Sequence, residues 1–142
     1  MKALTAQALR QEAGALEEKL TDIYHRLHMH PELGFQEKET AEMIRAELTK
    51  LGLPFMAAQT GTIVDLPVDG KMENAILLRA DIDALPITEA TGLPYASQNP
   101  GVMHACGHDS HAAMLLGAAQ LLQSHRDALR RPVRLVFQPA EE

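Results

Sequence analysis

The chain is organised around one short stretch, Met103-His104-Ala105-Cys106-Gly107-His108-Asp109-Ser110-His111. It holds three histidines, an aspartate and the only cysteine among the 142 residues. Alternate residues of an extended segment share one face, so His104, Cys106 and His108 would point the same way there. In a helix, Cys106 and His108 would diverge. A thiol and imidazoles that converge where a loop meets a helix are typical of a transition-metal site.

Composition limits the class of protein. At 46% hydrophobic residues the chain can build one domain with a core, and its net charge of −6 excludes a broad basic surface for nucleic acid or anionic membrane. A lone cysteine cannot form an internal disulfide and favours a reducing, cytoplasmic setting. The N-terminus lacks the apolar core of a signal peptide, and no apolar stretch is long enough to span a bilayer. We therefore expect a soluble protein.

Apolar periodicity predicts three helices. The first covers residues 4–29 and the second runs from Ala41 to Leu51. The third ends near Ser124, and either Asp109 or Ser110 can cap its start.

Three strands are expected, at residues 62–68, 75–79 and 133–138. Pro67 makes the first a candidate for the sheet edge, because proline cannot donate a hydrogen bond within a sheet. The second is apolar on both faces, as a buried central strand would be. A loop as long as 81–107 is usually functional.

The order of these elements predicts an α/β sheet in which a crossover helix joins the last two strands. If those strands are parallel, their carboxyl ends lie at one edge of the sheet. Asp81 and Asp83 follow one strand, Glu141 and Glu142 follow the other, and residues 104–108 precede the crossover helix. Ligand sites of open α/β sheets form outside the carboxyl ends of strands. Three polar clusters are therefore predicted to meet at one place.

The predicted cluster mixes sulfur, nitrogen and oxygen ligands. Cys106, His108 and a glutamate from 141–142 would suit Zn²⁺ and also Mn²⁺, Co²⁺ or Ni²⁺. A thiolate or carboxylate can bridge two ions, as in co-catalytic hydrolases. One of the adjacent glutamates could bind metal while the other takes a proton from a metal-activated water. Asp83 could accept a hydrogen bond from a ligand histidine and fix its orientation.

The roles of the neighbouring polar residues stay open at this point. His104 has a ligand-like offset, but it also suits a residue that contacts the substrate or supports a ligand. Asp81 is expected either to cap the strand end or to support the site, and Asp109 either to cap the helix or to bind metal. Four other histidines are expected to be structural, around the end of the first helix or in the first turn of the third: His25, His28, His30 and His111.

Three motifs resemble those of one known family: Met103-His104-Ala105-Cys106-Gly107-His108-Asp109, Arg79-Ala80-Asp81-Ile82-Asp83-Ala84-Leu85-Pro86 and Gln138-Pro139-Ala140-Glu141-Glu142. They are similar to motifs of the metal-dependent amidohydrolases, the group of hippurate hydrolase, indole-acetyl-amino-acid hydrolases and N-acetyl-diaminopimelate deacetylase in the aminoacylase/carboxypeptidase superfamily. Further stretches resemble signatures of the same family: His25-Arg26-Leu27-His28, Pro31-Glu32-Leu33-Gly34-Phe35 and Asn99-Pro100-Gly101-Val102. The resemblance runs from about residue 21 to the last residue.

This resemblance implies a three-layer, zinc-peptidase-like α/β catalytic domain with a central mixed sheet. It implies a two-metal hydrolase, with Zn, Mn, Co or Ni, that cleaves the amide bond of N-acyl amino acids or a small peptide. Cys106, His108 and Glu142 fall on metal-ligand positions and Glu141 on the general base. Asp83 falls on the acidic position that supports the site.

The resemblance also implies parts that these residues do not contain. The family takes two further histidine ligands from beyond the paired glutamates and carries an inserted lid domain that forms a homodimer. Because the chain stops directly after a strand, we expect residues 1–142 to be the N-terminal portion of a catalytic domain. We do not expect them to be active alone.

Two other classes of function remain open from the residues. One is a metal-binding module, or inactive fragment, without turnover. The other is a metal-independent hydrolase in which Cys106 is a nucleophile paired with a histidine. The carboxylates expected nearby disfavour the second, because negative charge raises the pKa of a thiol.

Overall fold

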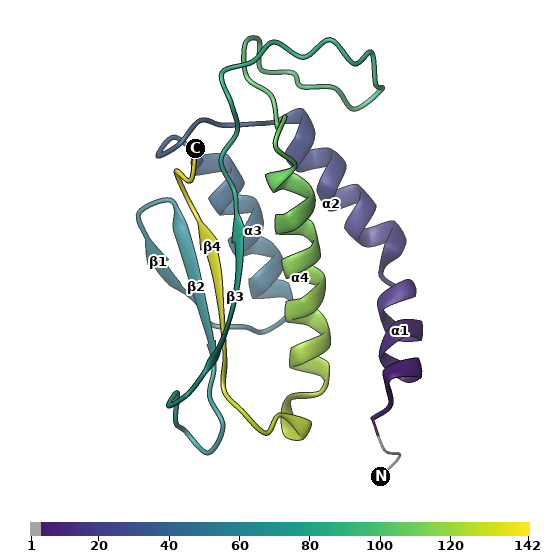
Figure 1. The fold of residues 1–142 in the computed structure, drawn as a ribbon, viewed down its shortest axis with the longest axis vertical. Helices are drawn as coiled ribbons and strands as arrows, with labels where there is room; N and C mark the ends of the chain where they lie inside the picture. The colour runs from purple at the N-terminus through teal and green to yellow at the C-terminus, as the bar shows by residue number, and fades with distance from the viewer. Residues whose placement is uncertain (1–3) are drawn as a thin grey trace.

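The computed structural model describes residues 4–142, which form one mixed sheet with helices packed against it (Figure 1). The helices are α1 (Ala6–Gly14), α2 (Glu17–Met29), α3 (Lys38–Lys50) and α4 (His108–Ser124), followed by a short 3-10 turn, η1 (Arg126–Ala128). The strands are β1 (Met56–Ala58), β2 (Gly61–Leu66), β3 (Ile76–Asp81) and β4 (Val133–Gln138). Within residues 4–142, no helix is long and apolar enough to cross a membrane.

The four strands lie in the order β1-β2-β4-β3. β4 is antiparallel to β2 and parallel to β3, and α4 is the connection between β3 and β4. The predicted α/β sheet with its parallel crossover is therefore confirmed. Asp81 at the end of β3 pairs with Gln138 at the end of β4, so the chain leaves both strands at the same edge of the sheet (Figure 1).

A hydrophobic core fixes these strand ends relative to the helices. Along β4, Val133, Leu135 and Phe137 are buried, while the residues between them are partly exposed. α3 and α4 contact the sheet, and α2 packs along α4. Each fully buried apolar side chain contributes about 1.5–3 kcal/mol relative to an exposed one. The edge that carries the polar clusters therefore adjoins a strand, β4, whose inward-facing side chains belong to the hydrophobic core.

Two helix predictions differ from the structure. The helix predicted over residues 4–29 is divided in two, because α1 ends at Gly14, a poor helix former, and α2 begins at Glu17. α4 begins at His108, and its N-cap is Gly107, whose φ of 88° lies in the left-handed region that glycine adopts readily. Neither Asp109 nor Ser110 is the cap, so that expectation is wrong.

The positions of two strands also differ from expectation. Within the described residues β3 is an edge strand with Leu77 58% exposed, and β4 is the central strand. β2 is internal despite Pro67, because this proline lies after the last residue of the strand and removes no ladder hydrogen bond. The sequence pattern does not indicate β1, which is short and exposed.

Candidate metal centre

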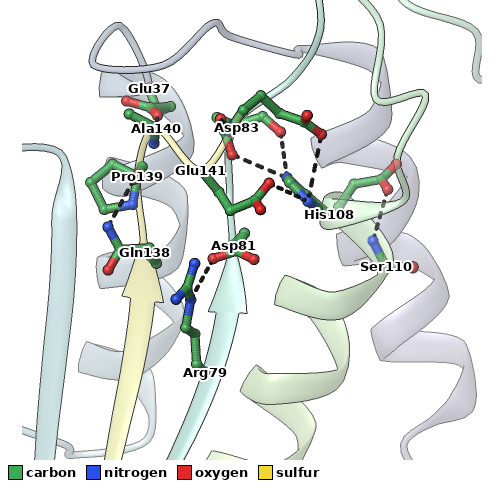
Figure 2. A network of polar contacts seen from close by, with 12 residues as sticks. Glu37, Arg79, Asp81, Asp83, His108, Ser110, Gln138, Pro139, Ala140 and Glu141 are labelled. Atoms are coloured by element: carbon green, nitrogen blue, oxygen red, sulfur yellow. Dashed lines mark hydrogen bonds and ion pairs between the residues drawn. The ribbon is translucent and has the colours of Figure 1, made fainter.

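Three segments converge at the carboxyl ends of β3 and β4 (Figures 1 and 2). The residues after β3 include Asp83, and those after β4 include Glu141 and Glu142. His108 enters from the first turn of α4. The structure thus brings the three polar clusters to one place, as the topology predicts.

His108 is buried, and its ring is held by Asp83. Nδ1 lies 3.0 Å from a carboxylate oxygen of Asp83 and 3.0 Å from the backbone oxygen of the same residue. Because both neighbours are acceptors, Nδ1 is the nitrogen that donates. The lone pair of a neutral ring is then on Nε2, which lies 3.6 Å from Glu141 and 3.8 Å from Glu142. This is the arrangement in which a histidine presents Nε2 to a metal ion.

Asp83 also holds the glutamates. Its second carboxylate oxygen accepts the backbone N–H of Glu142 at 2.8 Å. Asp83 is 1% exposed, so its carboxylate is satisfied by protein groups from the other two segments. One side chain therefore connects the end of β3 to the start of α4 and to the segment after β4 (Figure 2).

Two sets of ligand atoms share His108. In the first, atoms of Cys106, His108 and Glu142 lie within 4.8 Å of one another, and in the second the same holds for Asp81, His108 and Glu141. Thiolate, imidazole and carboxylate suit Zn²⁺ and its neighbours in the transition series. The residues present therefore fit a divalent ion. His104 belongs to neither set.

Cys106 is exposed, and its thiol lies among acidic side chains. A hydrogen bond to Glu142 raises the pKa of Cys106 above its ordinary value of 9.0, and the charges of Glu142, Glu141 and Asp83 raise it further. A protonated thiol is a weak nucleophile, whereas a bound cation would favour the thiolate. The surroundings of Cys106 therefore suit a ligand better than a nucleophile.

Asp81 and His104, whose roles the sequence leaves open, have different environments. The carboxylate of Asp81 accepts a hydrogen bond from Arg79 at 2.7 Å, which neutralises part of its charge beside the site (Figure 2). His104 is 4% exposed, and neither ring nitrogen has a partner among residues 4–142. Burial lowers the pKa of His104 and, together with the rings of His28 and His108, outweighs the opposing charges of Asp109 and Asp83. His104 is therefore a neutral, buried residue.

Asp109 contacts His28, a residue expected from the sequence to be structural, around the end of the first helix. One carboxylate oxygen of Asp109 lies 2.6 Å from Nδ1 of His28, and Nε2 of His28 lies 3.1 Å from Glu89 in the long loop. Burial lowers the pKa of His28, but hydrogen bonds to Asp109 and Glu89 and their charges outweigh it, so the pKa is raised. This contact ties α2 and the loop to the turn that carries His108. No local pattern could have revealed it, because the partners are 81 and 61 residues away.

We expect His28→Gln to destabilise the protein most at low pH. Because the folded-state pKa of His28 lies above its ordinary value of 6.5, the stability that His28 contributes is fully present below pH 6.5. It is lost as the pH rises through the folded-state pKa. Unpairing two buried carboxylates should cost about 3–5 kcal/mol where His28 is charged. The measurement is the free energy of unfolding against pH, with chelator present.

The matched control for this variant is His111→Gln, which changes an exposed histidine of α4 and should cost less than about 0.5 kcal/mol at any pH. A difference between wild type and His28→Gln that grows with rising pH would contradict the assigned ion pairs.

We expect Glu142→Gln to speed alkylation of Cys106 by iodoacetamide in metal-free protein at pH 8. The substitution removes the negative charge of the residue that raises the thiol pKa most, so a larger fraction of Cys106 becomes thiolate. The measurement is the rate of modification of the Cys106 peptide by mass spectrometry. Glu73→Gln, which changes an exposed glutamate in a turn, should leave the rate unchanged. An equal rate in all three proteins would show that Glu142 does not act on the thiol.

Comparisons with known proteins find relatives across most of the chain. Residues 77–142 match the family described as Peptidase family M20/M25/M40. The chain is 52% identical over 130 residues to N-acetyl-L-cysteine deacetylase of Bacillus subtilis (strain 168). The aligned residues cover 89% of this chain and 31% of that protein. It is 44% identical over 131 residues to N-acyl-L-amino acid amidohydrolase of Geobacillus stearothermophilus, over 89% of this chain and 35% of that protein.

A solved structure agrees with these sequence matches. A Bacillus subtilis protein described as a dinuclear metal binding peptidase from the M20 family superposes with a TM-score of 0.84 at 44% identity, over 90% of this chain and 36% of that one. The chain thus spans about a third of the length of the relatives it matches. The resemblance to the metal-dependent amidohydrolases is therefore confirmed. Residues 77–142 carry the sequence pattern of the peptidase family M20/M25/M40, and this range includes most of β3, all of α4 and β4, and the candidate metal centre.

Proposed function

We propose that this chain forms part of a metal-dependent amidohydrolase that cleaves the amide bond of N-acyl amino acids. The observation that supports this most is the convergence of Cys106, His108 and Glu142, with the carboxylate of Glu141 beside them. The names of two relatives, a deacetylase of N-acetyl-L-cysteine and an amidohydrolase of N-acyl-L-amino acids, support the class of substrate.

Cys106, His108 and Glu142 would hold metal, and residues outside these 142 would complete the ligand set. The relative described as a dinuclear metal binding peptidase supports a centre of two divalent ions, of Zn, Mn, Co or Ni. When bound, the ions supply a Lewis acid that polarises the amide carbonyl and makes a water molecule more acidic.

Glu141 is the residue that we assign to proton transfer. Its side chain is 40% exposed, which leaves the carboxylate accessible to water and substrate, and it lies 3.6 Å from Nε2 of His108. It would take the proton of the attacking water and deliver it to the nitrogen of the leaving amino acid. The side chain of Glu142 is 26% exposed, and its backbone N–H donates to Asp83, so Glu142 is better placed as the ligand. Asp83 would orient His108 and Glu142 and need not contact the substrate.

The chain would be the N-terminal portion of the catalytic domain, with a lid domain and a dimer interface contributed by other residues. The fraction of each relative that the chain covers, 31% and 35%, supports this assignment. The single cysteine supports a reducing, cytoplasmic setting.

We expect Glu141→Gln in the full-length protein to keep metal and lose activity. Glutamine has a similar shape but cannot accept the proton, and loss of a general base lowers kcat by about 10²–10⁴-fold. The measurements are metal content and hydrolysis of a panel of N-acyl amino acids, with and without chelator. Glu73→Gln, at an exposed turn far along the sequence, is the control and should keep both properties.

Two results would replace the proposal with another function. Activity that survives chelation but not alkylation of Cys106 would indicate a cysteine hydrolase. Bound metal without turnover of any N-acyl amino acid would indicate a binding module.

A further inference from the structure

Glu37 is a fully buried carboxylate that makes contact with the segment after β4. It lies directly before α3 and is 0% exposed. One carboxylate oxygen accepts the backbone N–H of Ala140 at 2.9 Å, and the other accepts the hydroxyl of Thr60 at 2.8 Å. Figure 2 shows Glu37 beside Ala140, at the point where the chain leaves β4 for Glu141.

We propose that Glu37 is a positioning residue of the metal centre, whose carboxylate fixes the turn at Ala140 and so directs Glu141 and Glu142 toward His108. The inference rests on the proposed function, because it assumes that the two glutamates act on metal and substrate. Glu37 itself would contact neither.

The turn that Glu37 holds is strained. Ala140 has a φ of 50°, in the left-handed region, which costs a residue other than glycine about 1–2 kcal/mol. Such a conformation persists only where the surroundings enforce it. Here the hydrogen bond from the N–H of Ala140 to Glu37 supplies a restraint at the strained residue itself. Without it, the segment could relax and the carboxylates would lose their direction.

The loop that leads to Glu37 contacts the same turn. A Cβ atom on Gly34 would lie 3.0 Å from the Cα of Ala140, so only glycine allows this approach without a shift of the backbone. The same loop is bonded to the segment after β3, because the N–H of Ala84 donates to the backbone oxygen of Glu32 at 2.8 Å. Residues 32–37 therefore touch both segments that carry the site.

A purely local role for Glu37, as the cap of α3, does not account for these contacts. The side chain of Glu37 makes no capping hydrogen bond. The first turn of α3 is capped by Glu32, whose carboxylate accepts the N–H groups of Glu39 and Thr40. Burying a carboxylate is costly, and within residues 4–142 Glu37 has no cation in salt-bridge contact. Its hydrogen bonds go to Ala140 and Thr60.

The test uses the full-length protein and three variants. Glu37→Ala removes the acceptor, whereas Glu37→Gln keeps an amide oxygen for the N–H of Ala140 and presents its NH₂ to the hydroxyl of Thr60, which can also accept. Glu47→Ala removes another buried carboxylate of α3, whose partners are Arg26, Lys50 and Lys19 instead of the site. It is the control for general destabilisation.

Two quantities are measured below the unfolding transition of every variant. The first is affinity for Co²⁺, followed by the absorption of the cobalt–thiolate complex. The second, which needs no metal, is amide hydrogen exchange of the peptide that contains Ala140. We expect Glu37→Ala to weaken Co²⁺ binding by about 10–100-fold and to speed exchange at least tenfold. Glu37→Gln should stay within a few-fold of wild type, and Glu47→Ala should leave both quantities unchanged.

The outcomes separate this inference from the proposed function. The assigned hydrogen bond would be overturned if Glu37→Ala and Glu47→Ala changed Co²⁺ affinity and amide exchange equally. It would also be overturned if Glu37→Gln lost as much Co²⁺ affinity as Glu37→Ala. A wild-type protein that binds no Co²⁺ would overturn the proposed function and, with it, a role for Glu37 in a metal centre. Weakened Co²⁺ binding with faster exchange in Glu37→Ala alone would support the inference.

Discussion

The pair of hydrogen bonds made by Asp83 is the interaction on which the candidate centre depends. A carboxylate has two oxygens, and here one binds the ring of His108 while the other binds the backbone of Glu142. The three segments involved are distant in sequence and meet only because β3 and β4 are parallel neighbours. A buried carboxylate is tolerated when its hydrogen bonds are complete. Burial of Asp83 in the fold therefore favours the positions of His108 and Glu142 that complete its hydrogen bonds.

Two further buried carboxylates make hydrogen bonds that connect the segments of the site to the rest of the fold. Glu37 binds the turn at Ala140, and Asp109 binds His28 beneath the first turn of α4. Backbone strain is found at the first of these places, where Ala140 has a φ of 50°. Strained positions held by buried hydrogen bonds are typical of functional sites, because they fix a geometry that the chain would not adopt alone. The site is thus a property of contacts across the fold.

The sequence predicts the parts of this arrangement that follow from local pattern and topology. The helix–strand order predicts the crossover, and the crossover predicts that Asp83, His108 and Glu141 lie at one edge. The order of strands in the sheet could not be predicted in the same way. β3 reads as central because it is apolar, yet an apolar run does not reveal its neighbours, and Leu77 is exposed among the described residues. Glu37 and His28 look like ordinary helix-end residues, because the contact of Glu37 with Ala140 spans 103 residues and those of His28 with Asp109 and Glu89 span 81 and 61.

X-ray absorption spectroscopy of the zinc-loaded full-length protein tests the central claim, that Cys106, His108 and a glutamate form a metal centre, most directly. We predict one sulfur scatterer at about 2.3 Å among nitrogen and oxygen scatterers at about 2.0–2.2 Å. In Cys106→Ser the sulfur signal should disappear. A zinc environment of nitrogen and oxygen alone in the wild type, or a sulfur signal that persists in Cys106→Ser, would contradict the assignment.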